Sequence, residues 1–429
     1  MAADPPSVTN AASGDAPILV ELAESRYDRQ QRVGWWDQAR LARARVLVVG
    51  AGALGNEVVK NLVLIGVGNI VVIDGDIVES SNLSRCIFFR SEDEGESKAL
   101  VLAQRAATLN PDVTIVGLPI DVRSLGSGVA LRADVIVGAL DNREARLYLN
   151  RLAARAGRSW VDGAIEALSG VARVFRPPDV CYECTLTESD WLTLAHRQSC
   201  RLLTKQDMQL GKVPTTATTS SIVAGIQSQE VVKLIHEGRP GVLPLSGGIV
   251  FDGANNDSYP LTYPTDPNCM AHHRYVDPIA ISLDSTTFGT VTFSAIAESA
   301  WPELSDLPGA HVTIDLGDDQ VVGWKCTTCG NRAPESRPAS LIAWGDGLCP
   351  ECGGARQPEV VTSVQIPGPH SGATAHSFGI RSDEILSVSS GSDERFVWLQ
   401  VSDARLPSAW AAVSVALPSD RERGSGSMS

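Results

Sequence analysis

The sequence has 429 residues and a formal net charge of −14 at pH 7, from 36 Lys and Arg against 50 Asp and Glu. This length exceeds what one hydrophobic core holds, so we expect two domains, and the acidic balance without basic runs argues against nucleic acid as a partner. No apolar stretch reaches the roughly 20 residues that span a bilayer, and the first residues lack a secretory signal pattern, so we expect a soluble, cytoplasmic protein without a membrane partner.

Composition divides the chain into four segments. Residues 1–22 are rich in Ala, Pro, Ser and Asp without periodicity, which predicts a disordered arm. Residues 23–275 carry the strand and helix patterns of a first domain. From residue 276 β-branched and turn residues predominate, which predicts a β-rich domain over residues 276–419. Residues 420–429, rich in Gly and Ser, are expected to form a flexible tail.

The first domain begins with the pattern of a strand, a loop and a helix. An apolar strand at residues 46–49 leads into the glycine loop GAGALG, and residues 57–65 carry the apolar stripe of a helix. Further apolar strands are predicted at residues 70–73, which end at Asp74, and at residues 135–138. Strands that alternate with helices predict an α/β, Rossmann-like fold with a mostly parallel sheet.

The rest of this domain is less regular. Residues 170–175 alternate as a strand does, and residues 219–235 have a helical period. Between them, residues 185–216 are polar without a clean period, which predicts a mobile crossover loop at the active edge of the sheet.

The glycine loop, with Gly50, Gly52 and Gly55, predicts a phosphate-binding turn. Backbone amides in such a loop can approach a phosphate, and the following helix N-terminus adds partial positive charge. Dehydrogenases share this motif, and in them an acidic residue after the next strand binds ribose hydroxyls. Because Asp74 suits that role equally well, an NAD-binding dehydrogenase stays an alternative at this point.

Charged residues downstream favour a nucleoside triphosphate. Arg85 and Lys98 are of the type that neutralises phosphate oxygens, and Asp141 at a strand end offers the oxygen ligand that Mg²⁺ prefers. A nicotinamide site needs no such cations. Taken singly, Asp74 and Asp76 could end a strand in a turn, and Lys98 could be a solvated helix residue. Together these residues predict a site for ATP and Mg²⁺.

Five segments in chain order resemble the ubiquitin-activating enzymes and their bacterial relatives of the ThiF, MoeB and HesA type. The resemblance covers about residues 26–275. The matching segments are RYDRQ, GAGALG, DGDIVESSNLSR, DEGESK and DNREARLYLN, which begin at Arg26, Gly50, Asp74, Asp93 and Asp141.

This resemblance implies a role for individual residues. It places Asp74 on the ribose, Asn82, Arg85 and Lys98 at the phosphates, and Asp141 on Mg²⁺. Arg29 would reach the phosphates of a partner subunit, which implies a homodimer.

Three residues of the matching segments need a separate interpretation. Cys86 stands where the family usually has Gln, and we interpret it as a small packing residue rather than a redox-sensitive thiol. Arg146 and Asn150 lie four apart on one predicted helix face, so structural hydrogen bonds explain them at least as well as substrate contacts do.

The resemblance also implies the reaction of a bacterial ubiquitin-like protein activating enzyme. The C-terminal carboxylate of a ubiquitin-like protein would attack the α-phosphate of ATP, forming an acyl-adenylate and releasing pyrophosphate. Catalysis would depend on positioning and on cationic stabilisation of the departing phosphates.

A first zinc site is implied around Cys181 and Cys184, where the resemblance places half of a structural site. The second half in the family is usually another C-x-x-C, whereas this sequence offers Cys269, His272 and His273. We expect Cys269 and His272 to complete a three-cysteine, one-histidine site. His273 is the alternative fourth ligand, and a kink without metal is the alternative to zinc.

A second cysteine set lies in the predicted C-terminal domain. Its spacing is C-x2-C-x19-C-x2-C, with a glycine after each pair, and its members are Cys326, Cys329, Cys349 and Cys352. This spacing predicts a zinc ribbon over residues 324–356, and disulfide pairing is the alternative that a cytosolic chain disfavours. We expect the ribbon to dock a substrate or carrier protein.

Cys200 lies outside both metal patterns, ahead of the Pro-Thr-Thr at residues 214–216. A similar Pro-Thr-Thr follows the nucleophilic cysteine in some relatives, and nearby His196, Arg197 and Arg201 would lower the pKa of the Cys200 thiol. We therefore expect a thioester on Cys200 and transfer to a conjugating enzyme. The alternatives are an adenylation-only enzyme that activates a sulfur-carrier protein, with an incidental cysteine here, and a non-catalytic scaffold.

Overall fold

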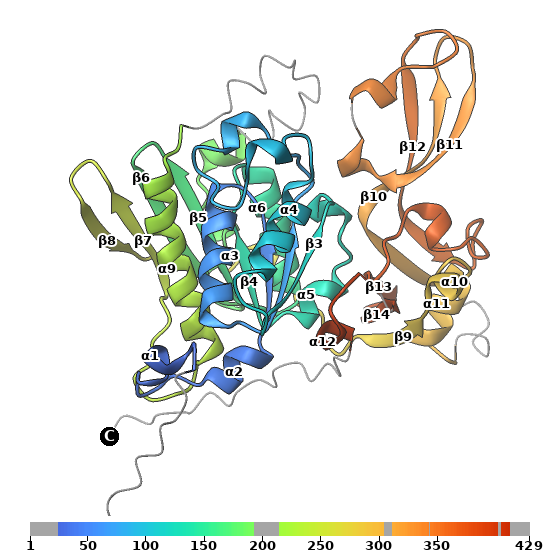
Figure 1. Ribbon diagram of the computed structural model, residues 1–429. Coiled ribbons are helices and arrows are strands. Elements are labelled where there is room, and N and C mark those ends of the chain that lie inside the picture. Colours follow the sequence, from blue (N-terminus) through green and yellow to red (C-terminus); the bar gives the residue numbers. More distant parts are fainter. Residues whose placement is uncertain (1–24, 193–213, 304–310, 343, 402–404, 412–429) are drawn as a thin grey trace, which may run out of the picture.

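The computed structural model describes residues 25–192, 214–303, 311–342, 344–401 and 405–411, in which two β-sheets organise the chain (Figure 1). Most of the predicted crossover loop therefore lies outside the described residues. The first sheet contains β1 (Arg45–Val49), β2 (Asn69–Ile73), β3 (Thr114–Leu118), β4 (Val135–Gly138), β5 (Trp160–Glu166), β6 (Ser169–Phe175), β7 (Gly247–Asp252) and β8 (Asp257–Leu261). The helices around it are α1 (Asp28–Gln31), α2 (Gln38–Arg43), α3 (Ala53–Ile65), α4 (Lys98–Ala107), α5 (Gly128–Arg132), α6 (Arg143–Arg155) and α9 (Ala217–Ile235).

The first sheet has the strand order β3-β2-β1-β4-β5-β6-β7-β8. The strands from β3 to β5 are parallel, and those from β5 to β8 are antiparallel. This arrangement confirms the predicted α/β fold with a mostly parallel sheet. Because β1 is followed by β2 on one side and by β4 on the other, the strand order reverses at β1, where open α/β sheets bind ligands at the carboxyl ends of their strands.

The apolar run of β1 is explained by helices on both faces of the sheet. Val46 and Val48 pack in a core with residues of α3, α4 and α9, whereas Leu47 and Val49 pack in a second core with α5 and α6. Successive strand side chains point to opposite faces, so only a strand covered on both sides is apolar throughout. Figure 1 shows α3 and α9 side by side on one face.

The second sheet forms the predicted β-rich region and has the order β11-β10-β13-β14-β9, with β12 also paired to β10. The first half of β10 pairs with β13, and its second half continues as a three-stranded finger with β11 and β12 (Figure 1). The elements of this region are β9 (Ile279–Leu283), α10 (Ser285–Phe288), α11 (Phe293–Ala300), β10 (Val312–Cys326), β11 (Arg332–Pro338), β12 (Arg356–Ile366), β13 (Ile385–Ser390), β14 (Asp393–Val401) and α12 (Ser408–Ala411). Across the described ranges, no helix is both long and apolar enough to cross a membrane.

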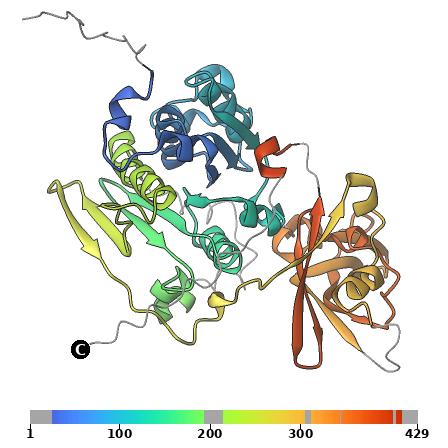
Figure 2. The ribbon, with the colours of Figure 1, turned by 90° about the horizontal axis from the view of Figure 1, so that it is seen from below.

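The two sheets are joined through α5. A Cβ at Gly128 would lie 2.1 Å from the Trp398 Nε1, so the backbone of α5 touches β14 directly. The buried Arg132 guanidinium donates to the Asp383 carboxylate at 2.7 Å and to the Trp410 carbonyl at 2.9 Å. Figure 2 shows α12, which carries Trp410, lying against the first sheet and apart from the rest of the second. The junction is therefore a buried interface rather than a linker.

We predict that Arg132→Ala lowers the free energy of unfolding by about 3–5 kcal/mol, because the Asp383 carboxylate would stay buried without its cation. Burial already raises the Asp383 pKa above its ordinary value despite Arg132. Acidification protonates an unpaired Asp383 readily, so the loss should shrink as the pH falls. Denaturant unfolding at several pH values measures both effects.

The matched control is Arg32→Ala, which removes an exposed pair with Asp28 at 2.8 Å and should cost about 1 kcal/mol or less. Equal losses in the two variants would contradict a special role for the buried pair.

Candidate functional site

The glycine loop connects β1 to α3 in a shape that depends on its glycines. Gly50 has a φ of 103°, and a Cβ there would lie 2.3 Å from the Ala139 carbonyl oxygen. A Cβ at Gly55 would lie 1.9 Å from the Gly50 carbonyl oxygen. At Gly52, by contrast, no atom of the described residues other than those of its two chain neighbours lies within 4 Å of the Cβ position. The first and third glycines permit the turn, and the second leaves its backbone open to a ligand.

Asp74 at the end of β2 holds this loop. Its carboxylate accepts the Ala51 amide at 2.6 Å and the Asp76 amide at 2.8 Å. Burial raises the pKa of the Asp74 carboxyl, although these two amides and Lys98 act against the rise. Asp74 therefore lies directly beside the glycine loop, where a ribose would meet it.

Lys98 begins α4 and brings a cation to the same place. Its ammonium pairs with the Asp76 carboxylate at 2.9 Å, and Ser97 caps the helix by accepting the Leu100 amide. Burial acts to lower the Lys98 pKa, but Asp76 and the more distant Asp74 and Asp141 raise it above its ordinary value. Lys98 is therefore a fully charged group among three carboxylates, which a triphosphate with Mg²⁺ would match.

The turn after β2 contains three further predicted residues. Arg85 is half-buried, and its guanidinium donates to the Ser81 carbonyl. Asn82 is buried, and its side-chain oxygen accepts the Glu79 amide at 2.9 Å, so in this structure it holds the turn. Burial raises the pKa of the Cys86 thiol to about 11, which supports a packing role and argues against a reactive thiol.

Asn56 is a site residue that the sequence reasoning missed. Its buried side chain donates to the Ala51 carbonyl at 2.8 Å and to the Gly52 carbonyl at 3.1 Å, and it accepts the Phe88 amide at 3.0 Å. It therefore ties the glycine loop to the turn that carries Arg85. The available signal was a polar side chain directly after the glycine loop, one residue before the predicted helix.

Asp141 follows β4 and is exposed at the same edge. Beneath it, Arg146 donates to the Leu140 carbonyl and to the Asp162 carboxylate, the latter at 3.0 Å. Asp162 is fully buried and also pairs with Arg173. Burial acts to raise the Asp162 pKa, but the two guanidinium groups hold it below its ordinary value.

These contacts give Arg146 and Asn150 structural roles. Arg146 holds the peptide next to Asp141, and the Asn150 side-chain oxygen accepts the Tyr182 amide at 2.8 Å. The structural interpretation of these two residues fits the observed contacts.

Arg29 lies far from the glycine loop of its own chain. It belongs to α1, whose Gln30 side chain donates to the Ile65 carbonyl at 2.7 Å. Ile65 ends α3, and the glycine loop precedes the other end of this 13-residue helix, which is about 20 Å long. Arg29 therefore does not join the site of its own chain in this structure.

Both predicted cysteine sets come together. The Cys181 Sγ lies 3.7 Å from the Cys184 Sγ and 3.6 Å from the Cys269 Sγ, and the Cys184 Sγ lies 3.3 Å from the His272 Nε2. Tetrahedral zinc with bonds of about 2.3 Å places its sulfur ligands about 3.8 Å apart. The geometry thus fits a metal, with His272 rather than His273 in the group.

The second set lies at the tip of the finger. Its sulfur pairs, Cys326 with Cys352 and Cys329 with Cys349, are 3.6 and 3.7 Å apart, and all four thiols are free rather than disulfide-bonded. The amides of Thr328 and Cys329 point at the Cys326 sulfur, each at 3.4 Å. These features fit a zinc ribbon rather than the disulfide alternative.

Cys200 lies outside the described residues, as do His196, Arg197 and Arg201. The segment after it is described from Pro214 onwards, and Thr216 caps α9 by accepting the Thr219 amide at 3.2 Å. The predicted nucleophile therefore stays a prediction.

Comparisons with known proteins place the first domain in a family. The sequence profile described as "ThiF family" matches residues 27–269 and ends before β9. The SAMP-activating enzyme E1 of Haloferax volcanii is 34% identical over 281 residues, which cover 61% of this chain and 95% of that protein. The sulfur carrier protein adenylyltransferase of Thermus thermophilus is 41% identical over 169 residues, which cover 37% of this chain and 62% of that protein.

Further similarities include a human protein and a solved structure. The ubiquitin-like modifier-activating enzyme 7 of Homo sapiens is 38% identical over 173 residues, 38% of this chain and only 17% of that protein. The crystal structure of E. coli MccB with ATP is 21% identical and covers 59% of this chain and 75% of that one, with a TM-score of 0.49.

We predict that Asn56→Ala lowers the free energy of unfolding by about 2 kcal/mol or more, because it leaves the buried Phe88 amide and the Ala51 carbonyl without a partner. Urea unfolding measures the loss. Asn61→Ala on the same helix removes a single half-buried contact to the Ser228 hydroxyl at 3.3 Å and should cost about 1 kcal/mol or less. A smaller loss for Asn56→Ala than for this control would show that Asn56 does not hold the glycine loop to the turn that carries Arg85.

Proposed function

This chain belongs to the ThiF family, and we propose that it uses ATP to adenylate the C-terminal carboxylate of a ubiquitin-like or sulfur-carrier protein. The observation that carries the proposal is the convergence of Lys98, Asp74, Asp76 and Asp141 beside the open face of Gly52. The names of the relatives that activate such proteins support the substrate class.

The described residues suggest how each part of ATP would be held. The Gly52 backbone and the α3 N-terminus would face the phosphates, and Asp74 would accept ribose hydroxyls. Lys98 would exchange Asp76 for a phosphate oxygen, with Arg85 beside it. Asp141 would hold Mg²⁺, which supplies charge stabilisation on the phosphates when it is bound.

The chemistry then follows from the substrate. A carboxylate oxygen of the carrier attacks the α-phosphorus, the bond to the β,γ-phosphates breaks, and pyrophosphate leaves with its electron pair. The product is a mixed anhydride of the carrier and AMP. The protein's contribution is position and charge rather than a covalent step. A dehydrogenase would use the glycine loop and Asp74 but would leave Lys98, Arg85 and Asp141 without a function.

We further propose that the Cys200 thiolate attacks the acyl carbon of this anhydride. A thioester forms, AMP leaves, and the carrier passes to a conjugating enzyme. The second candidate is an adenylation-only enzyme that delivers the acyl-adenylate to sulfur transfer, and the sulfur carrier relative supports it. The adduct on Cys200 distinguishes the two candidates.

A homodimer completes the proposal. Arg29 lies about one length of α3 away from the glycine loop of its own chain, so it could contact phosphates only in a partner subunit.

The finger with its ribbon lies beyond the family match, and we propose that it docks the carrier or the conjugating enzyme.

We predict that Asp141→Ala reduces carrier-dependent ATP–pyrophosphate exchange by roughly 100-fold or more, because the Mg²⁺ ligand is lost.

Cys200→Ala should keep the exchange and lose the thiol-sensitive adduct, whereas Cys200→Ser should retain an adduct that resists dithiothreitol. The measurement uses ATP, Mg²⁺ and ubiquitin-like proteins encoded near this gene, and Cys86→Ala is the cysteine control because its thiol is buried.

Exchange without any adduct in the unaltered protein would support the adenylation-only candidate. If no carrier supports exchange and ATP does not bind, the adenylation proposal fails.

We also propose that each cysteine group holds one zinc ion, which would supply a closed structural crosslink. We predict two zinc ions per chain by elemental analysis, and one after either Cys184→Ser or Cys352→Ser. Cys86→Ser, outside both groups, should leave the content unchanged. A purified protein without bound zinc, or a Cys352→Ser variant that keeps both ions, would overturn the assignment.

A further inference from the structure

The segment between β3 and β4 touches the nucleotide site at its beginning. The Leu118 carbonyl at the end of β3 accepts the Asp74 amide at 3.3 Å. Beside it, the Cβ position of Gly75 lies 3.2 Å from the Asp121 amide nitrogen, so the turn after β2 packs on the backbone of Asp121. In a sheet ordered β3-β2-β1, phosphates bind after β1 and the ribose after β2, so the base lies towards the end of β3. Residues 119–122 would therefore form a wall on the adenosine side of a nucleotide bound in this way, and we call them the adenosine wall.

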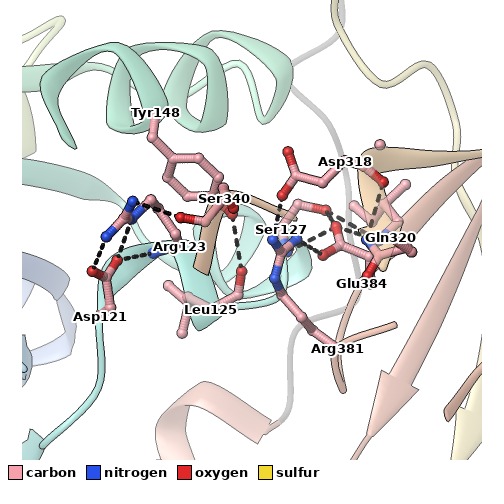
Figure 3. A network of polar contacts seen from close by, with 12 residues as sticks. Asp121, Arg123, Leu125, Ser127, Tyr148, Asp318, Gln320, Ser340, Arg381 and Glu384 are labelled. Atoms are coloured by element: carbon pink, nitrogen blue, oxygen red, sulfur yellow. Dashed lines mark hydrogen bonds and ion pairs between the residues drawn. The ribbon is translucent and has the colours of Figure 1, made fainter. Parts of the chain in front are cut away.

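The same segment reaches the C-terminal domain through Arg123. The Asp121 carboxylate accepts the Arg123 backbone amide at 2.8 Å and two of its guanidinium donors at 2.9 and 2.6 Å. The remaining guanidinium nitrogen of Arg123 donates to the Ser340 carbonyl at 2.9 Å (Figure 3). Ser340 lies in the helical turn Ala339–Leu341, which directly follows β11 at the root of the finger. One side chain thus bridges the adenosine wall and the finger.

A second, buried joint fixes the domain next to this bridge. Arg381 of the C-terminal domain pairs with Glu384 at 2.9 Å and faces the ring of Tyr148 on α6. Glu384 in turn accepts the Ser127 amide at 3.2 Å, and the Tyr148 hydroxyl donates to the Leu125 carbonyl at 3.3 Å (Figure 3). Burial acts to lower the Arg381 pKa, but Tyr148 and the carboxylates around it raise it, so the joint stays ionic. This joint keeps Ser340 in reach of Arg123.

We propose that Arg123 is a positioning residue of the nucleotide site, through which the docked C-terminal domain holds the wall that contacts the adenosine half of ATP. The inference rests on the proposed function for the identity of the nucleotide. It extends that function because the C-terminal domain, which lies beyond the residues that match the family, would then help to hold the nucleotide site in place.

Equilibrium binding to the full-length protein, without a carrier protein, tests this inference. Arg123→Ala should raise the Kd for ATP about tenfold, the effect of losing a charged hydrogen-bonding group, and should change the affinity for inorganic tripolyphosphate by less than about twofold. Arg123→Lys should recover part of the ATP affinity because its ammonium can keep one contact. In pyrophosphate exchange, the KM for ATP should rise while kcat at saturating ATP stays within about twofold.

Two further variants separate the domain from the residue. Glu384→Gln weakens the buried joint without touching Asp121 or Arg123, and it should raise the Kd for ATP in the same direction. Arg337→Ala alters another arginine near the finger root, which pairs with Glu335 and Asp346 inside the C-terminal domain, and it should leave the Kd unchanged. Unfolding midpoints confirm that each variant is folded.

The outcomes distinguish this inference from the proposed function. If the unaltered protein binds ATP and exchanges pyrophosphate but Arg123→Ala keeps its ATP affinity, the inference is wrong and the function stands. Equal losses of ATP and tripolyphosphate affinity, or an unchanged Kd in folded Glu384→Gln, would also overturn it. An unaltered protein that binds no ATP refutes the proposed function itself.

Discussion

The hydrogen bond from the Ala51 amide to the Asp74 carboxylate, 2.6 Å long, is the contact on which the arrangement of the site depends. It ties the loop after β1 to the end of β2, so the two elements to which we assign the phosphates and the ribose in the proposed site cannot move independently. Asp76, held by the same carboxylate, then sets the place of Lys98. A buried carboxylate needs such donors, because an unpaired charge inside a protein is strongly unfavourable.

Patterns local to the sequence predicted the features that depend on nearby residues. Because β1 and β2 are covered on both faces of the sheet, their residues are apolar throughout. The apolar runs at residues 46–49 and 70–73 therefore predicted the parallel sheet. The spacing of Cys326 and Cys329 is likewise set by a single turn, whose amides point at one sulfur. Such features leave a signature because the residues that cause them are adjacent in the chain.

Features that depend on distant partners could not be predicted. Asn56 forms a hydrogen bond with Phe88, 32 positions later, and Arg123 forms one with Ser340, 217 positions later. The sequence around Asn56 or Arg123 therefore does not indicate which residue is its partner. The pairing of β9 with β14 is of the same kind, because only the fold brings residue 279 beside residue 397. For the first cysteine group the sequence did predict Cys269 and His272, with His273 as the alternative, and the structure brings His272 into the group.

The junction between the sheets favours one orientation because its contacts are ionic as well as apolar. An apolar interface tolerates sliding, whereas the contacts of Arg132 with Asp383 and of Ser127 with Glu384, which cross the junction, are satisfied in one geometry only. The root of the finger is thereby held next to the segment that follows β3, and Figure 1 shows the finger extending upward beside the first domain. A partner bound to the finger would be tethered to the same molecule as the nucleotide, and its effective concentration there would exceed that in solution. Rigid docking of the C-terminal domain raises this effective concentration further, because a freely moving domain would distribute the partner over all orientations.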